Sequence, residues 1–181
     1  MATTYIITGP PGAGKSTLSE QLALSFERGL HVNCDNIYNM VRGGYKEPWE
    51  DTDRTLSNLM FTAAKSVLEV YVPGGFIPVV DYVFSIEELI SFIGHLSGRI
   101  CLTIVVPDLK TNIERDKSRK LTVGEERIRH YHGYYEALRE KLEPLFLAET
   151  NLTPEGSVAD IKTRKGYSAA DLIELLTVCS R

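Results

Sequence analysis

The chain has 181 residues, of which 43% are hydrophobic and 24% are charged, and its formal net charge is −4. These values suit one globular domain over residues 1–181. Because the net charge is negative, the protein as a whole has no electrostatic attraction for extended nucleic acid. No apolar run is long enough to span a bilayer. The three cysteines lack the spacing of a disulfide framework or a zinc site, and the start shows no leader pattern. We therefore expect a cytoplasmic protein without membrane contact.

The first predicted element is a buried strand over residues 3–8, which are mainly β-branched and aromatic. The next residues, Gly9-Pro10-Pro11-Gly12-Ala13-Gly14-Lys15-Ser16, fit the pattern G-x-x-x-x-G-K-[ST]. Residues 16–24 then have apolar side chains at helical spacing. Glycines in an ordinary turn are the plain alternative. A strand, a glycine loop and a helix in this order instead predict a site for nucleotide phosphates.

The residue types of this loop match the chemistry of a bound triphosphate. Gly9, Gly12 and Gly14 allow successive backbone N–H groups to turn toward a phosphate, and the following helix adds the positive end of its dipole. Lys15 supplies a mobile cation, and the Ser16 hydroxyl suits a Mg²⁺ ligand. We predict that ATP and Mg²⁺ are bound by Gly9, Pro10, Pro11, Gly12, Ala13, Gly14, Lys15, Ser16 and Thr17, with Ser16 as the metal ligand and Lys15 as a catalytic residue.

The middle of the chain alternates strands with helices. Residues 29–33 predict a second strand, with Asp35 just beyond it, and a polar segment follows over 36–51. A helix is expected over 53–71, where apolar residues form one stripe and Pro73-Gly74-Gly75 ends it. Residues 76–80 predict a third strand that ends at Asp81.

The second half continues the alternation. A capping box, Ser85-Ile86-Glu87-Glu88, predicts a helix over 86–95. The elements expected after it are a strand over 100–106, a charged stretch over 114–129, a helix over 131–146, a last strand over 157–161 and a closing helix from Ser168 to Val178. The alternation predicts an α/β fold with a parallel sheet covered on both faces. In such sheets ligands bind beyond the carboxyl ends of the strands, and the glycine loop, Asp35 and Asp81 all fall there.

These segments carry a resemblance to a known group. The loop, Asp35 to Tyr45 and Pro48-Trp49-Glu50 resemble small P-loop kinases of the gluconate kinase-like group, and Asp81-Tyr82-Val83-Phe84 looks like the Asp-containing segment of chloramphenicol phosphotransferases. Shikimate kinases are similar in architecture. The resemblance implies a three-layer P-loop NTPase fold with about five strands, a substrate-binding segment near 36–72 and a lid near 114–128.

Two departures narrow the resemblance. Tyr82 stands where the antibiotic kinases have a second acidic residue, and the glycine-glycine-arginine signature of shikimate kinases is absent. The second departure argues against shikimate as the substrate.

Three side chains are candidates for catalysis besides Lys15. Asp35 is expected to accept or orient the acceptor hydroxyl; alternatively, it caps a helix that begins at Asn36. By the resemblance, Arg115 and Arg119 correspond to lid arginines that stabilise negative charge on the transferred phosphate. The alternative for both arginines is a solvated helix face.

Several residues are candidates for the acceptor and adenine sites. Arg42, Tyr45 and Trp49 are expected to line the acceptor pocket, although packing of the loop explains them equally well. Asp81 and Tyr82 are assigned to the same pocket; Asp81 either binds an acceptor hydroxyl or a Mg²⁺-bound water, or is a solvated strand end. The resemblance places Arg164 near adenine. His130-Tyr131-His132 is expected to be structural, because neighbouring residues on a helix cannot chelate together.

We predict an ATP- and Mg²⁺-dependent kinase that phosphorylates a hydroxyl of a small molecule, with a sugar acid such as gluconate as one candidate. A nucleoside, nucleotide or polynucleotide-end kinase and a nucleotide-dependent switch remain as alternatives. The guanine-binding pattern N-K-x-D of GTPase switches is absent. The sequence leaves the acceptor and the oligomeric state open.

Overall fold

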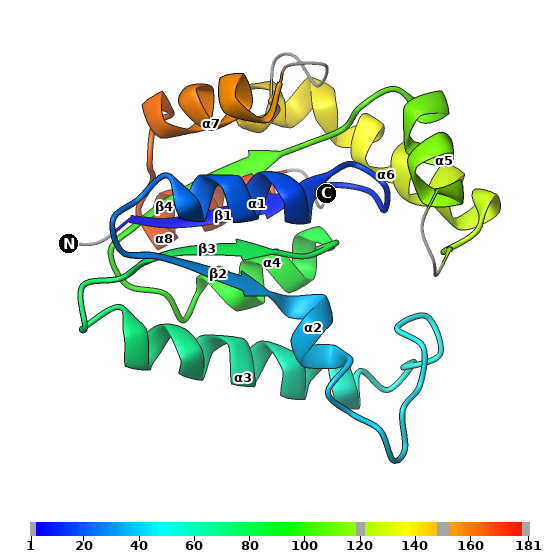
Figure 1. The fold of residues 1–181 in the computed structure, drawn as a ribbon, viewed down its shortest axis with the longest axis horizontal. Helices are drawn as coiled ribbons and strands as arrows, with labels where there is room; N and C mark the ends of the chain where they lie inside the picture. Colours follow the sequence, from blue (N-terminus) through cyan, green and yellow to red (C-terminus); the bar gives the residue numbers. More distant parts are fainter. Residues whose placement is uncertain (1–2, 119–121, 148–152, 179–181) are drawn as a thin grey trace.

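A four-stranded parallel sheet forms the centre of the molecule (Figure 1). The structure is a computed structural model that describes residues 3–118, 122–147 and 153–178. The strands are β1 (Thr3–Thr8), β2 (Gly29–Asn33), β3 (Ile77–Asp81) and β4 (Arg99–Ile104), in the order β2-β3-β1-β4. All three pairings are parallel.

Helices cover both faces of this sheet, as expected. They are α1 (Lys15–Leu24), α2 (Cys34–Tyr38), α3 (Thr55–Tyr71), α4 (Ile86–Ile93), α5 (Leu109–Lys117), α6 (Glu125–Leu142), α7 (Pro154–Thr163) and α8 (Ala169–Thr177), with a short 3-10 turn at Glu143–Leu145. Successive strand residues point to opposite faces. Ile6 therefore belongs to the core shared with α3, α4, α6 and α8, while Ile7 belongs to the core shared with α1 and α7.

The expected strand over 157–161 is wrong, because these residues lie within α7. Pro154 occupies the first turn of this helix, and the Thr153 hydroxyl accepts a hydrogen bond from the Gly156 amide at 3.2 Å. Proline at the first turn and a threonine cap both favour a helix start. Among the described residues, the sheet thus has four strands rather than about five. Beyond β4, Phe146 makes one isolated parallel bridge to Ile104.

The remaining elements occur with shifted ends. The capping box at Ser85 and Glu88 is confirmed at the start of α4, and Ser168 caps α8. α6 begins at Glu125 instead of residue 131 and ends at Leu142, before the 3-10 turn. β4 stops at Ile104 instead of residue 106.

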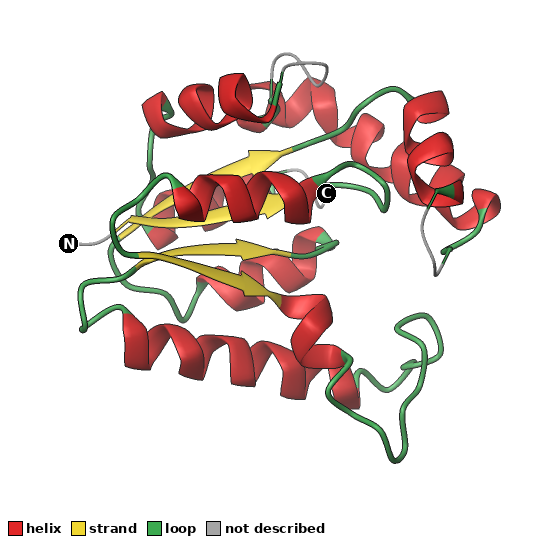
Figure 2. Cartoon of the chain, viewed as in Figure 1, coloured by secondary structure: helices red, strands yellow, loops and turns green. Residues whose placement is uncertain are grey.

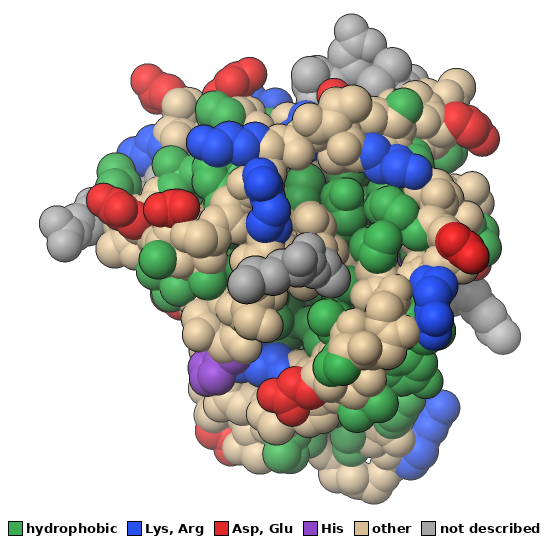
Figure 3. All heavy atoms as spheres, turned by 90° about the vertical axis from the view of Figure 1, so that its left-hand side faces the viewer, with side chains coloured by type: hydrophobic (Ala, Val, Ile, Leu, Met, Phe, Trp, Pro, Cys, Tyr) green, Lys and Arg blue, Asp and Glu red, His purple; other side chains and the backbone are tan. Residues whose placement is uncertain are grey.

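All four strands end at the same edge of the sheet, where β1 leads into the glycine loop and β2 into α2 (Figure 2). Figure 3 shows the other end of the molecule, where the strands begin, and on its visible surface hydrophobic, basic and acidic side chains are interspersed. The residues predicted for the site at the strand ends, in the glycine loop and at Asp35 and Asp81, instead lie at the carboxyl ends of the strands.

Candidate active site

The loop between β1 and α1 requires glycine at two positions. Gly9 has a φ of 148°, and a Cβ atom there would lie 2.0 Å from the Val105 carbonyl oxygen. Gly12 has a φ of 78°, and its Cβ would lie 2.5 Å from the Asn112 carbonyl oxygen. Backbone with positive φ and such close neighbours accepts no side chain. The loop therefore curves tightly against the residues after β4 and the start of α5.

Lys15 begins α1, and its side chain is 7% exposed. Its ammonium group reaches back over the loop and donates a hydrogen bond to the Pro10 carbonyl at 3.0 Å. The cation thus lies over the concave side of the backbone, where the positive end of the helix dipole adds to its charge.

Ser16 belongs to a polar cluster at the ends of β2 and β3. Its hydroxyl donates to Asp81 Oδ2 at 2.7 Å and accepts from Asn33 Nδ2 at 3.0 Å. Asn33 also donates to the Asp81 carboxylate, and His31 Nε2 lies 2.5 Å from Asp81 Oδ1. Asp81 is fully buried, so the alternative of a solvated strand end is wrong. A carboxylate bonded to the Ser16 hydroxyl can orient that oxygen toward a metal ion.

His31 and Asn33 were not identified from the sequence, although a signal was present. They alternate along β2 and therefore share a face of the strand. The register pairs Asn33 with Asp81 across β2 and β3. Once the strand order is known, this register places both side chains beside the carboxylate.

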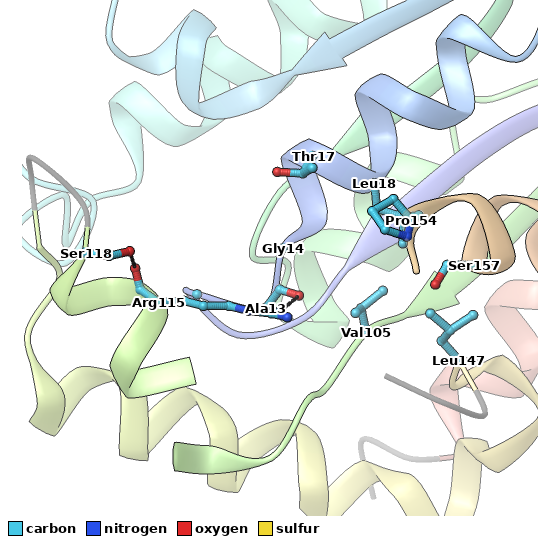
Figure 4. Close-up of a pocket in the computed structure, with 11 residues that line it drawn as sticks. Ala13, Gly14, Thr17, Leu18, Val105, Arg115, Ser118, Leu147, Pro154 and Ser157 are labelled. Carbon is cyan, nitrogen blue, oxygen red and sulfur yellow. Dashed lines mark hydrogen bonds between the residues drawn. The ribbon is translucent and has the colours of Figure 1, made fainter. Parts of the chain in front are cut away.

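A cavity of about 390 Å³ lies on the other side of the loop, toward α5 and α7. In Figure 4, the Arg115 side chain reaches from α5 to the loop, where its guanidinium donates to the Ala13 carbonyl at 3.3 Å. Thr17 also lines this cavity, opposite apolar surface from Val105, Leu147 and Pro154. Sequence reasoning missed these apolar residues because their segments are brought together only by the fold.

A smaller cavity of about 130 Å³ adjoins the loop on the side of α2. Its polar residues are Lys15, Ser16 and Asp35, and its other lining residues are Pro11, Pro48, Trp49, Tyr82, Val83, Val123 and Tyr131. The fold therefore brings together the phosphate loop, the candidate base and two of the predicted acceptor-site aromatics. Tyr131, expected to be purely structural, lines this cavity.

The helix-capping alternative for Asp35 is wrong. The Asn33 side chain caps α2 by accepting from the Asn36 amide at 2.7 Å, and Asp35 lies in the first turn. Asp35 lines the small cavity together with Lys15 and Ser16.

Other predicted residues lie apart from the two cavities or have structural contacts. Arg42 and Tyr45 are exposed and line neither cavity, and Tyr45 donates to Glu47 at 3.2 Å. Arg164 follows α7 and donates to Asp160 and to the Leu145 and Phe146 carbonyls; its stacking on adenine stays a prediction. Arg119 lies outside the described residues.

The described residues fit a magnesium-bound nucleoside triphosphate. Gly12, Ala13 and Gly14 line the cavity of about 390 Å³, so the loop backbone is accessible to a phosphate. Ser16 offers a hydroxyl ligand, and Lys15 a cation. Within the described ranges, no group of three or more His, Cys, Asp or Glu side chains forms a metal site, and no helix is long and apolar enough to cross a membrane.

Comparison with solved structures identifies the fold. A gluconokinase from Sinorhizobium meliloti 1021 matches with a TM-score of 0.63 and 16% identity, over 99% of this chain and 98% of that chain. The chain has the fold of the P-loop kinases. A deoxyadenosine kinase from M. mycoides with bound dATP matches with a TM-score of 0.54 and 16% identity, over 88% and 97% of the two chains.

A third similar structure belongs to a larger protein. A chain of the Pnkp1/Rnl/Hen1 RNA repair complex matches with a TM-score of 0.65 and 16% identity over 84% of this chain, which spans about half (51%) of that chain. No family model matches the sequence, and no curated protein matches it. At these identities the similarity establishes the fold, and the substrate has to be argued from the site.

Proposed function

We propose that this protein is an ATP- and Mg²⁺-dependent kinase that transfers the γ-phosphate to a hydroxyl of a small molecule. One observation carries the proposal: Lys15, Ser16 and Asp35 line the same cavity of about 130 Å³. Phosphoryl transfer to an alcohol requires three groups close together: a cation for the phosphates, a ligand for the metal ion and a carboxylate for the acceptor hydroxyl. Lys15, Ser16 and Asp35 would supply them in that order.

Each residue of the site would have a separate role in phosphoryl transfer. Bound Mg-ATP would supply the phosphoryl group and the charge-neutralising cation. The loop amides and Lys15 would hold the phosphates, and Ser16, oriented by Asp81, would ligate the metal. Asp35 would position the acceptor hydroxyl and accept its proton. Arg115, already against the loop at Ala13, would stabilise negative charge on the transferred group.

The acceptor is a further part of the proposal. A sugar acid such as gluconate and a nucleoside are the candidates to test first. The similar structures include a gluconokinase and a deoxyadenosine kinase, which makes both classes reasonable probes. We propose a small acceptor rather than extended nucleic acid, because the net charge of −4 disfavours a polyanion.

The proposal is tested by acceptor-stimulated ADP production in the wild type and in Lys15→Ala. We expect the variant to lose about 10²–10³-fold in kcat, since a charged group that stabilises the transferring phosphate is removed. Circular dichroism should show an unchanged fold. Lys110→Ala, which removes an exposed lysine of α5, is the matched control and should retain activity. Unchanged turnover in Lys15→Ala would contradict the assignment of the loop.

A further inference from the structure

A second cavity continues the acceptor site away from the phosphate loop. It measures about 230 Å³ and shares Pro48, Tyr82, Val83 and Tyr131 with the smaller cavity. The two cavities therefore adjoin, and a molecule whose hydroxyl lies at Asp35 would place its body along them. Together they lie near the lower end of the range typical of small-molecule sites, about 300–1,000 Å³.

Flat side chains line the passage between these cavities. Tyr82 is 6% exposed and packs edge-on against Phe61 and Phe84, with ring centroids 5.5 Å and 5.3 Å apart. Tyr134 lines the second cavity, and its hydroxyl accepts from the Ile86 amide at 2.8 Å. These contacts hold the rings in place before any ligand arrives, which lowers the entropy lost on binding.

Trp49 also lines the small cavity, and its ring contacts a side chain of α6. The Arg127 guanidinium of α6 lies 4.0 Å from the centroid of the Trp49 ring. This cation–π contact joins α6 to the segment between α2 and α3. Trp49 is 41% exposed, yet it lines the small cavity beside Asp35, so its ring is available to a bound molecule.

The charges along the two cavities disfavour an acidic acceptor. Among the described lining residues there are three carboxylates, on Asp35, Asp51 and Glu88, and two cations, on Lys15 and Arg54. Arg54 forms an ion pair with Glu88, and Lys15 belongs to the phosphate loop. A carboxylate on the acceptor would therefore meet mainly negative charge.

The tyrosines add no charge of their own. Burial raises the pKa of Tyr82, and nearby carboxylates, first Glu88, raise it further. Burial and Glu88 likewise raise the pKa of Tyr131. Both phenols are thus neutral near pH 7 and present flat surfaces with a hydrogen-bonding tip.

We propose that the acceptor hydroxyl is carried on a flat, uncharged ring system that packs against Trp49, Tyr82 and Tyr131. This inference rests on the proposed kinase function and specifies its substrate class. A nucleoside and an aryl alcohol share this chemistry, and the experiment separates them.

The binding test uses the fluorescence of Trp49, which is the only tryptophan of the chain. The full chain, with Mg²⁺ and a non-hydrolysable ATP analogue, is titrated with thymidine, 3-phenylpropan-1-ol and gluconate. We expect a saturable change with at least one of the two ring compounds and none with gluconate at tenfold higher concentration. The same compounds are then tested with Mg-ATP for a phosphorylated product, and whichever ring compound reacts identifies the source of the ring.

Variants of Tyr131 test the packing itself. Tyr131→Leu keeps an apolar side chain but removes the flat ring, and we expect the KM of the ring alcohol to rise about tenfold with little change in kcat. Tyr131→Phe should restore the wild-type KM. Tyr71→Leu, whose ring packs against Phe76 at the other end of α3, is the matched control and should have no effect.

The outcomes separate this inference from the kinase proposal. If gluconate is phosphorylated with a higher kcat/KM than both ring compounds, or if neither ring compound changes the fluorescence of protein that binds Mg-ATP, the ring acceptor is wrong and the kinase stands. An unchanged KM in Tyr131→Leu also overturns the inference. If calorimetry shows no Mg²⁺-dependent ATP binding, the kinase proposal itself fails.

Discussion

At the scale of single residues, Asp35 is the side chain that best tests the proposed division between nucleotide binding and phosphoryl transfer. It lines the cavity of about 130 Å³ together with Lys15 and Ser16. We expect Asp35→Asn to lower kcat by about 10²–10⁴-fold, the usual contribution of a positioned acid–base group, and to leave the KM for ATP nearly unchanged. Steady-state kinetics with varied ATP and acceptor measures both quantities.

The prediction for Asp35→Asn is compared with a change at a second carboxylate outside the cavity. Glu20→Gln removes an exposed carboxylate from α1 and should leave both constants unchanged. If Asp35→Asn weakens ATP binding while kcat stays normal, Asp35 acts on the nucleotide and not on the acceptor.

The tight glycine loop between β1 and α1 could be predicted from the sequence because the pattern of glycines itself specifies the backbone conformation. Gly9 and Gly12 adopt the positive φ values that the pattern demands. The partners of Asp81 could not be predicted with the same certainty, since they depend on the register of β2 against β3. Tyr131 was missed because its position depends on how α6 packs over the acceptor segment.

At the scale of elements, the start of α3 depends on one buried carboxylate. Asp51 is 4% exposed, and it accepts from the Ser57 amide at 2.8 Å, the Ser57 hydroxyl at 2.7 Å and the Leu56 amide at 3.2 Å. Burial alone would raise the pKa of Asp51, but these hydrogen bonds bring it below its ordinary value. The ionised carboxylate therefore supplies acceptors for the unpaired amides of the first turn.

This arrangement predicts a pH-dependent stability. A carboxyl group with a lowered pKa in the folded state stabilises the protein above its unfolded pKa of about 3.9, and this contribution is lost as the pH falls through the folded value. We expect Asp51→Asn to lower the free energy of unfolding by about 1–3 kcal/mol at pH 7. The difference from the wild type should shrink below about pH 4. Denaturation with urea at several pH values measures it.

Glu69→Gln, an exposed change on the same helix, provides the comparison and should have little effect at either pH. A difference between the wild type and Asp51→Asn that stays constant down to pH 2–3 would show that ionisation of Asp51 does not stabilise α3.

The strand that was expected over 157–161 shows that a short apolar segment does not by itself distinguish a strand from a helix. Val158 and Ile161 are buried in the core shared with α1, and their spacing of three suits a helix. The start signals of Thr153 and Pro154 lie just before them, so α7 could have been predicted from the sequence.

At the scale of the whole molecule, ligand binding should stabilise the fold. A ligand that binds only the folded state adds about 2.7 kcal/mol at 100 times its Kd. For a chain of this size, that energy corresponds to a rise in Tm of about 5–10 °C. We expect this shift with Mg-ADP in thermal denaturation, and a much smaller shift in Lys15→Ala at the same concentration. Equal shifts in the two proteins would mean that the nucleotide binds away from the loop.

The border of β4 that faces away from β1 bears on whether two copies of the protein can pair through their sheets. Among the described residues, this side is bridged at Ile100 with Tyr167 and at Ile104 with Phe146. The Leu147 amide also donates to the Ile104 carbonyl at 2.9 Å. Open strand borders invite aggregation through intermolecular β-pairing. Because these segments of the same chain pair with both ends of β4, fewer of its backbone groups are left to pair with a strand of another copy.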